Sequence, residues 1–187
     1  RFNSLTIITF SGKSLLPVHS KFDVPSQLDE VYGLCMYKNP KTEECFVFIN
    51  SKNGEIEQWS LTFEMDQIKP LIVRRLSVPS QPEGMVADDR TGYLYVAEEN
   101  GGIHIFNADP ESDTTYKTIP LSDSLNPKIC YDIEGLAIWR AGINEGYLLA
   151  SIQVNNTFAI FSLPEHRYLG SFGIKGEITD SVEETDG

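Results

Sequence analysis

The chain has 187 residues and a formal net charge of −12, with 27 acidic against 15 basic side chains. This acidic balance argues against a nucleic-acid partner, because binding phosphates needs a basic face. Hydrophobic residues make up 41% and aromatic residues 11% of the chain, which is enough to build a core. No apolar run approaches the ~20 residues of a membrane span. We therefore expect one domain of ordinary size and no membrane partner.

Three segments of the chain align with one another, at residues 32–61, 83–108 and 134–163. Their opening glycines, Gly33, Gly84 and Gly135, recur at the same interval twice, about 50 residues. Each segment is predicted to form three strands. The first strands are GLCMY, GMVAD and GLAIW, the second CFVFIN, YLYVAE and YLLASI, and the third EIEQWSL, GIHIFNA and TFAIFSL. This period, with β-branched and aromatic residues in the strands, is typical of a β-propeller blade.

The connections between the repeats predict further elements of the blades. RRLSV at 74–78 and RYLGSF at 167–172 are each expected to add a fourth, outer strand, and residues 3–10 would end an earlier blade. One aromatic residue recurs near the end of the third strand and is expected to pack between blades. These residues are Phe10, Trp59, Phe106 and Phe161. The predicted fold is therefore an all-β propeller of about three to four blades. Because an open arc exposes two apolar blade faces, we expect the chain to be an internal piece of a larger ring.

Two other groups of side chains are expected to be structural. The three cysteines Cys35, Cys45 and Cys130 form no CxxC motif, which gives a zinc or thioredoxin site no support. Cys35 and Cys45 are expected to be small buried residues, and a cross-strand disulfide between them is left open. Asp88 and Asp89 precede a turn, where aspartate caps backbone N–H groups.

In a propeller the innermost strands converge on a central channel, so that equivalent residues far apart in sequence meet there. Glu83 and Glu134 stand just before the repeat glycines, and Tyr32 holds that position in the first repeat. Asp132 lies two residues before Glu134 and points the same way in an extended chain. The ends of the second strands are expected at the same place. The residues there are Lys52, Glu98, Glu99 and Gln153.

The predicted cluster therefore contains four carboxylates, from Glu83, Glu99, Asp132 and Glu134, with Gln153 as a neutral oxygen donor. Carboxylates brought this close repel one another unless they are protonated or bound to cations. Their hard oxygens suit Ca²⁺, and the lack of Cys or His beside them argues against zinc. The alternative is a solvated or salt-bridged rim with no metal.

Five motifs carry a resemblance to a known family. YGLCMYK, NSKNGEIEQW, EGMVADDRTGYLYVAEE, DIEGLAIW and GYLLASIQVNNTFAIF together resemble the β-propeller phytases, in family order and over nearly the whole chain. That family is a six-bladed ring of calcium-dependent enzymes that remove phosphate from inositol hexakisphosphate (phytate). The resemblance implies that residues 1–187 are a partial propeller domain, without the N-terminal segment and the closing blade. It also implies a secreted or periplasmic protein that is monomeric at full length.

The resemblance also implies roles for particular residues. Several Ca²⁺ ions would be held by Glu83, Glu99, Asp132, Glu134, Gln153 and Asp180, with Asp186 as a competing register for the last. Phosphate would be bound by Arg1, Tyr32 and Lys52. Glu83, Glu99, Asp132, Glu134, Lys52 and Tyr32 would together form the catalytic set.

The function implied is a calcium-dependent phosphomonoester hydrolase of 3-phytase type, in which a metal-activated water attacks phytate. One alternative is a catalytically inactive, calcium-binding propeller that serves as an interaction module. Another is a calcium-dependent lactonase or esterase propeller, which would not need a cationic grip on phosphate. The presence of Lys52 and Tyr32 beside the acidic residues favours the phosphatase.

Overall fold

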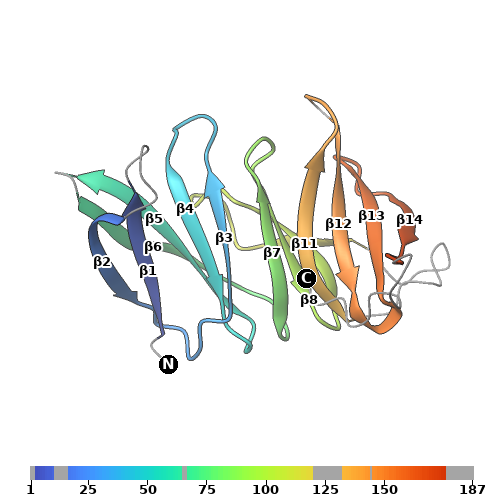
Figure 1. Ribbon diagram of the computed structural model, residues 1–187, viewed down its shortest axis with the longest axis horizontal. Coiled ribbons are helices and arrows are strands. Elements are labelled where there is room, and N and C mark those ends of the chain that lie inside the picture. Colours follow the sequence, from blue (N-terminus) through green and yellow to red (C-terminus); the bar gives the residue numbers. More distant parts are fainter. Residues whose placement is uncertain (1–2, 11–16, 65–66, 120–131, 144, 176–187) are drawn as a thin grey trace.

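The computed structural model describes residues 3–10, 17–64, 67–119, 132–143 and 145–175. These residues form one two-stranded and three four-stranded antiparallel sheets. Figure 1 shows the sheets standing side by side in chain order, like the blades of a propeller. The predicted all-β propeller of three to four blades is confirmed. Within the described residues, no helix is long and apolar enough to cross a bilayer.

Each four-stranded sheet is one repeat of the sequence, laid down as a simple meander. The incomplete sheet pairs β1 (Ser4–Phe10) with β2 (Pro17–Pro25). Blade 1 consists of β3 (Gly33–Lys38), β4 (Cys45–Asn50), β5 (Glu55–Glu64) and β6 (Gln67–Ser77). Blade 2 consists of β7 (Pro82–Asp88), β8 (Tyr93–Glu98), β9 (Gly102–Asn107) and β10 (Tyr116–Ile119). Blade 3 consists of β11 (Ile133–Arg140), β12 (Gly146–Ile152), β13 (Thr157–Leu163) and β14 (Tyr168–Phe172), with a 3₁₀ turn (Gln153–Asn155) after β12. The fourth strands expected at RRLSV and RYLGSF are β6 and β14, whereas β10 was not predicted.

The core lies between the blades rather than within one sheet. Successive residues of a strand point to opposite faces, so β4 sends Phe46 and Phe48 towards blade 2 and Val47 and Ile49 towards β1. Both faces are covered, which explains why the second strands read as continuous apolar runs. The predicted interblade aromatics are confirmed where their side chains are described. These are Trp59, Phe106 and Phe161, all buried; the side chain of Phe10 lies outside the described set.

The far face of blade 3 is apolar and open to solvent. Trp139, 62% exposed, stacks on Tyr147 with ring centroids 5.5 Å apart. The two rings line an apolar cavity of about 370 Å³ on this face. Its other lining residues are Leu149, Ile160, Leu169 and Phe172. The exposed apolar face expected of an open arc is therefore present on this side.

The repeat glycines allow the innermost strands to run side by side (Figure 1). A Cβ on Gly84 would lie 2.5 Å from the carbonyl oxygen of Glu134 and 2.8 Å from the Cα of Gly135. A Cβ on Gly33 would lie 3.3 Å from the carbonyl oxygen of Glu83. At Gly84 only a residue without a side chain permits this approach, and at Gly33 a side chain would also press on Asn50, whose Oδ1 would lie 2.9 Å from the Cβ. The close contact between blades therefore explains the glycine at this position in the first two repeats.

Asp88 and Asp89 join the blades at the other end of the innermost strands. Asp88 is fully buried and accepts a hydrogen bond from the Arg90 backbone N–H at 3.0 Å. Its carboxylate also forms ion pairs at 3.3 Å with Arg90 and with Arg140 of blade 3. Asp89 accepts the backbone N–H of Lys38 in blade 1 at 2.9 Å. The predicted structural role of the two aspartates is confirmed.

The structure settles the open question of a Cys35–Cys45 disulfide, which does not form. Both cysteines are free thiols and half-buried. The strand register explains this, because Cys35 lies opposite Phe48 and Cys45 lies opposite Lys38. Burial, with a smaller contribution from Asp89, raises the pKa of the Cys35 thiol to about 12. Cys130 lies outside the described residues.

The contact at Gly84 makes a prediction about stability. We expect Gly84→Ala to lower the free energy of unfolding by about 1–3 kcal/mol, because the added methyl group would overlap backbone atoms of β11. The matched control is Gly142→Ala, whose Cβ would meet its nearest neighbour, on Glu145, at 4.0 Å. Urea denaturation followed by tryptophan fluorescence measures both variants. Equal stability of the two variants would contradict the proposed packing.

Candidate functional site

One end of the innermost strands gathers the residues that the repeat predicts to meet. At this end the backbone forms a series of three hydrogen bonds, which we call the rim ladder. The N–H of Glu99 donates to the carbonyl of Gln81 at 3.0 Å, that of Asp132 to Glu99 at 2.8 Å, and that of Gln153 to Asp132 at 3.0 Å. The ladder joins the start of β7, the end of β8, the start of β11 and the end of β12. Three of the predicted site residues are therefore adjacent in space although they are far apart in sequence.

The other two acidic residues lie in β-bulges on the innermost strands. The register of β7 shifts between Pro82 and Met85, and that of β11 between Ile133 and Leu136. Glu83 and Glu134 are in the irregular segments, each followed by the repeat glycine. A bulge redirects a side chain away from the ordinary alternation of the strand. Blade 1 has Tyr32 in place of a glutamate before its repeat glycine, and there β3 and β4 keep a regular register. The bulges therefore occur in the two blades that carry a glutamate at this position.

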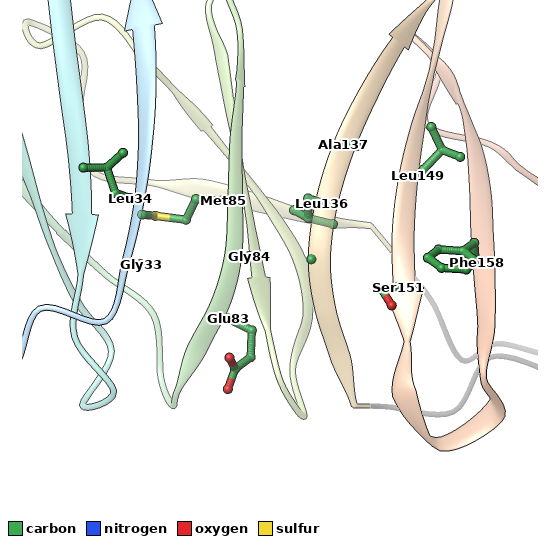
Figure 2. A pocket seen from close by; sticks show the side chains of 11 residues that line it. Gly33, Leu34, Glu83, Gly84, Met85, Leu136, Ala137, Leu149, Ser151 and Phe158 are labelled. Atoms are coloured by element: carbon green, nitrogen blue, oxygen red, sulfur yellow. The ribbon is translucent and has the colours of Figure 1, made fainter. Parts of the chain in front are cut away.

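Glu83 lies at one end of a cavity of about 370 Å³ along the innermost strands. Figure 2 shows its carboxylate near the strand ends, below the apolar side chains of Leu34 and Met85. Gln81 donates a side-chain hydrogen bond to this carboxylate. Glu134 is 8% exposed. The strand ends are thus acidic, whereas the middle of the channel wall is apolar.

Lys52 and Tyr32 form a pair at the same end of blade 1. The Lys52 ammonium lies 4.4 Å from the centroid of the Tyr32 ring, a cation–π contact. The backbone N–H of Tyr32 donates to the carbonyl of Asn50 at 2.9 Å. Because Tyr32 is 43% exposed and Lys52 is exposed, both groups are open to a ligand.

Asn50 connects this pair to the acidic rim, a role that the sequence did not indicate. Its side-chain oxygen accepts the N–H of Gly33 at 2.6 Å, and its Nδ2 donates to the carbonyl of Glu83 at 3.3 Å. Asn50 is fully buried. The feature of the sequence that could have indicated this role of Asn50 is its position as the polar last residue of the apolar strand CFVFIN.

Glu98 is the other polar end of a buried strand, and it is 3% exposed. Ser80 Oγ donates to its carboxylate at 2.5 Å, and His104 Nε2 lies 2.6 Å from the other oxygen. Burial alone would raise the pKa of Glu98, but the bonds from Ser80 and His104 outweigh it and hold the pKa below its usual 4.5. Of the two glutamates predicted at this strand end, Glu98 is therefore internal, and Glu99 stands on the rim ladder.

The donor set at the rim has the chemistry of a calcium site. Four carboxylates and an amide supply hard oxygens, which Ca²⁺ prefers. In the described part of the chain, however, no three His, Cys, Asp or Glu side chains are grouped so that they could hold a metal ion. The ladder brings the backbones together, whereas the carboxylates are spread along the rim. Arg1, Asp180 and Asp186 lie outside the described residues.

Comparison with known proteins gives one family. A family model described as Phytase matches residues 3–187. A 3-phytase of Bacillus subtilis (strain 168) is 36% identical to this chain over 170 residues, covering 88% of this chain and 43% of the relative. The chain thus spans less than half the length of that relative.

A solved structure supports the fold. Apo AztD from Citrobacter koseri matches with a TM-score of 0.54 at 15% identity, covering 97% of this chain and 44% of that chain. At this identity the likeness concerns the fold alone.

The buried Glu98 predicts how stability depends on pH. Since its pKa is lowered on folding, its contribution is present above pH 4.5 and is lost as the pH falls through the folded-state value. We expect Glu98→Gln to be less stable than the wild type near neutral pH, with a difference that shrinks below pH 4.5. Urea denaturation across this pH range measures it. A difference independent of pH would show that the carboxylate is not charged in the folded protein.

Proposed function

Because this chain belongs to the phytase family, we propose that the protein releases phosphate from phytate and that it does so with Ca²⁺ at the rim. The observation that supports this proposal most is the rim ladder, which connects Glu99, Asp132 and Gln153 of two blades. Glu83 and Glu134 stand in bulges at the same end of these blades. Residues of blades 2 and 3 therefore contribute to one acidic edge, and the Lys52–Tyr32 pair of blade 1 lies at the same end.

Charge explains why a cation belongs in this reaction. Phytate is highly anionic, the chain carries a net charge of −12, and the rim is lined by carboxylates. Direct contact between phytate and the carboxylates of the rim would be repulsive. We propose that Glu83, Glu99, Asp132, Glu134 and Gln153 hold the cations that resolve this conflict. Bound Ca²⁺ would supply positive charge to the phosphate oxygens and Lewis acidity to water.

The remaining roles belong to side chains of blades 1 and 2. The Lys52 ammonium would bind a phosphate oxygen directly, and the Tyr32 ring would keep it at the rim through the cation–π contact. Glu83, at the end of the cavity, would orient the attacking water and accept its proton. Arg1 and Asp180 would add a phosphate contact and a cation ligand, a proposal that depends on the family resemblance alone. A lactonase or esterase needs no such anion grip, so the Lys52–Tyr32 pair favours the phosphatase.

The calcium requirement is tested by chelation. We expect the full-length protein to release inorganic phosphate from phytate only with Ca²⁺ present. A calcium chelator should bring the release down to that of an enzyme-free blank, because the rim then repels the substrate, and added Ca²⁺ should restore it. Release that is unaffected by the chelator would contradict the metal role.

The phosphate grip is tested by removing one charge. We expect Lys52→Ala to lower kcat/KM for phytate by about 10-fold to 100-fold, which is the value of a lost charge-assisted hydrogen bond. The matched control is Lys41→Ala, an exposed lysine in the β3–β4 turn at the other end of blade 1. Steady-state phosphate release measures both variants. Equal kcat/KM values for the two variants would remove Lys52 from the site.

A further inference from the structure

We propose that Glu98, held by Ser80 and His104, is a positioning group that fixes Glu99 on the rim. The catalytic consequence of this inference rests on the proposed function. The positioning of Glu99 by Glu98 does not depend on it. The carboxylate of Glu98 is buried beneath the turn that carries Glu99. It neither faces the channel nor belongs to the set of proposed cation ligands.

Two parallel links join the β8–β9 turn to the segment that precedes β7. The first is the side-chain bond from Ser80 to Glu98, at 2.5 Å. The second link joins the residue that follows each of these two. It is the backbone hydrogen bond from the Glu99 N–H to the carbonyl of Gln81, at 3.0 Å. Because the links involve consecutive residues on both segments, the first restrains the second. Loss of the Glu98 carboxylate would leave the turn joined to the segment before β7 by backbone hydrogen bonds alone.

The turn itself is packed onto the Glu98 side chain. A Cβ on Gly101 would lie 1.7 Å from Glu98 Oε2, so the carboxylate passes directly under the backbone of the turn. From the other side His104 Nε2 contacts the same oxygen at 2.6 Å, and His104 Nδ1 lies 2.8 Å from Thr118 Oγ1. An ionised carboxylate only accepts, so Nε2 of His104 donates to it. A series of hydrogen bonds thus runs from the outer strand β10 to the rim.

Blade 3 shows that the fold does not require a charge at this place. Glu98 pairs with Pro82 at the start of β7, and the equivalent residue Ile152 pairs with Ile133 at the start of β11. Ile152 is 0% exposed and belongs to the apolar core between blades 2 and 3. Replacing a buried ionic group by a well-packed apolar side chain of similar volume is often neutral or stabilising. We therefore attribute the presence of a carboxylate instead of an apolar residue in blade 2 to the geometry of the turn above it, since the fold itself does not require one.

The position of Glu99 matters because it connects the two blades. Its carbonyl accepts the N–H of Asp132 at 2.8 Å and that of Ile133 at 3.2 Å. A displacement of the turn would therefore move two proposed cation ligands together, Glu99 and Asp132. Replacing a residue that orients a metal ligand typically lowers metal affinity or activity by about 10-fold to 100-fold.

The test compares Ser80→Ala and Glu98→Ile with the wild type in the full-length protein. Glu98→Ile copies the apolar residue that blade 3 has at this place, whereas Ser80→Ala keeps the Glu98 carboxylate and removes the link to it. The control is Glu111→Gln, an exposed glutamate in the β9–β10 loop of the same blade. Amide hydrogen exchange at Glu99 and Asp132 reports on position without any substrate. We expect exchange at least about tenfold faster at these amides in both variants, with core amides of β8 unchanged.

Calcium-dependent phosphate release from phytate is measured on the same variants. We expect kcat per folded molecule to fall about tenfold or more, at a temperature where both variants are fully folded, a loss that a purely stabilising residue would not produce. Faster exchange in the variants of a protein that releases no phosphate would support the positioning role while contradicting the proposed function. Unchanged exchange, or a loss of turnover that only follows the loss of folded protein, would overturn the inference.

Discussion

The close contact between the innermost strands is the constraint on which the site depends. At Gly84 the backbone of β7 passes so near to β11 that no side chain fits between them. This contact places the start of one blade against the next and allows the backbone of Glu99 to bond to Asp132. The acidic residues are thus brought together by main-chain packing rather than by attraction between their side chains, which would repel one another.

The two ends of the blades differ in the balance between acidic and basic side chains. At one end Asp88 is fully buried but paired with Arg90 and Arg140, so its charge is neutralised inside the protein and joins blades 2 and 3. Among the rim residues that the structure describes, the carboxylates of Glu83, Glu99, Asp132 and Glu134 outnumber the ammonium of Lys52, which contacts the Tyr32 ring. An edge with this imbalance is suited to binding cations and, through them, an anionic ligand.

The blades were predictable from the sequence because a 50-residue period, apolar second strands and recurring aromatics all agree. The fourth strand β10 was missed because YKTI has four residues and its two apolar residues, Tyr116 and Ile119, do not alternate with polar ones. The convergence of Glu99, Asp132 and Gln153 followed from the repeat alone. The bulges at Glu83 and Glu134, the bridge made by Asn50 and the burial of Glu98 did not, since each depends on register between strands. The same dependence on register excluded the disulfide between Cys35 and Cys45.

The central claim is that carboxylates from different blades share Ca²⁺ at the rim. Anomalous diffraction from crystals of the full-length protein grown with Ca²⁺ tests this claim most directly. The account predicts calcium peaks within coordination distance of oxygens from Glu83, Glu99, Asp132 and Glu134. Calcium bound elsewhere, with these carboxylates facing solvent or paired with basic side chains, would contradict it.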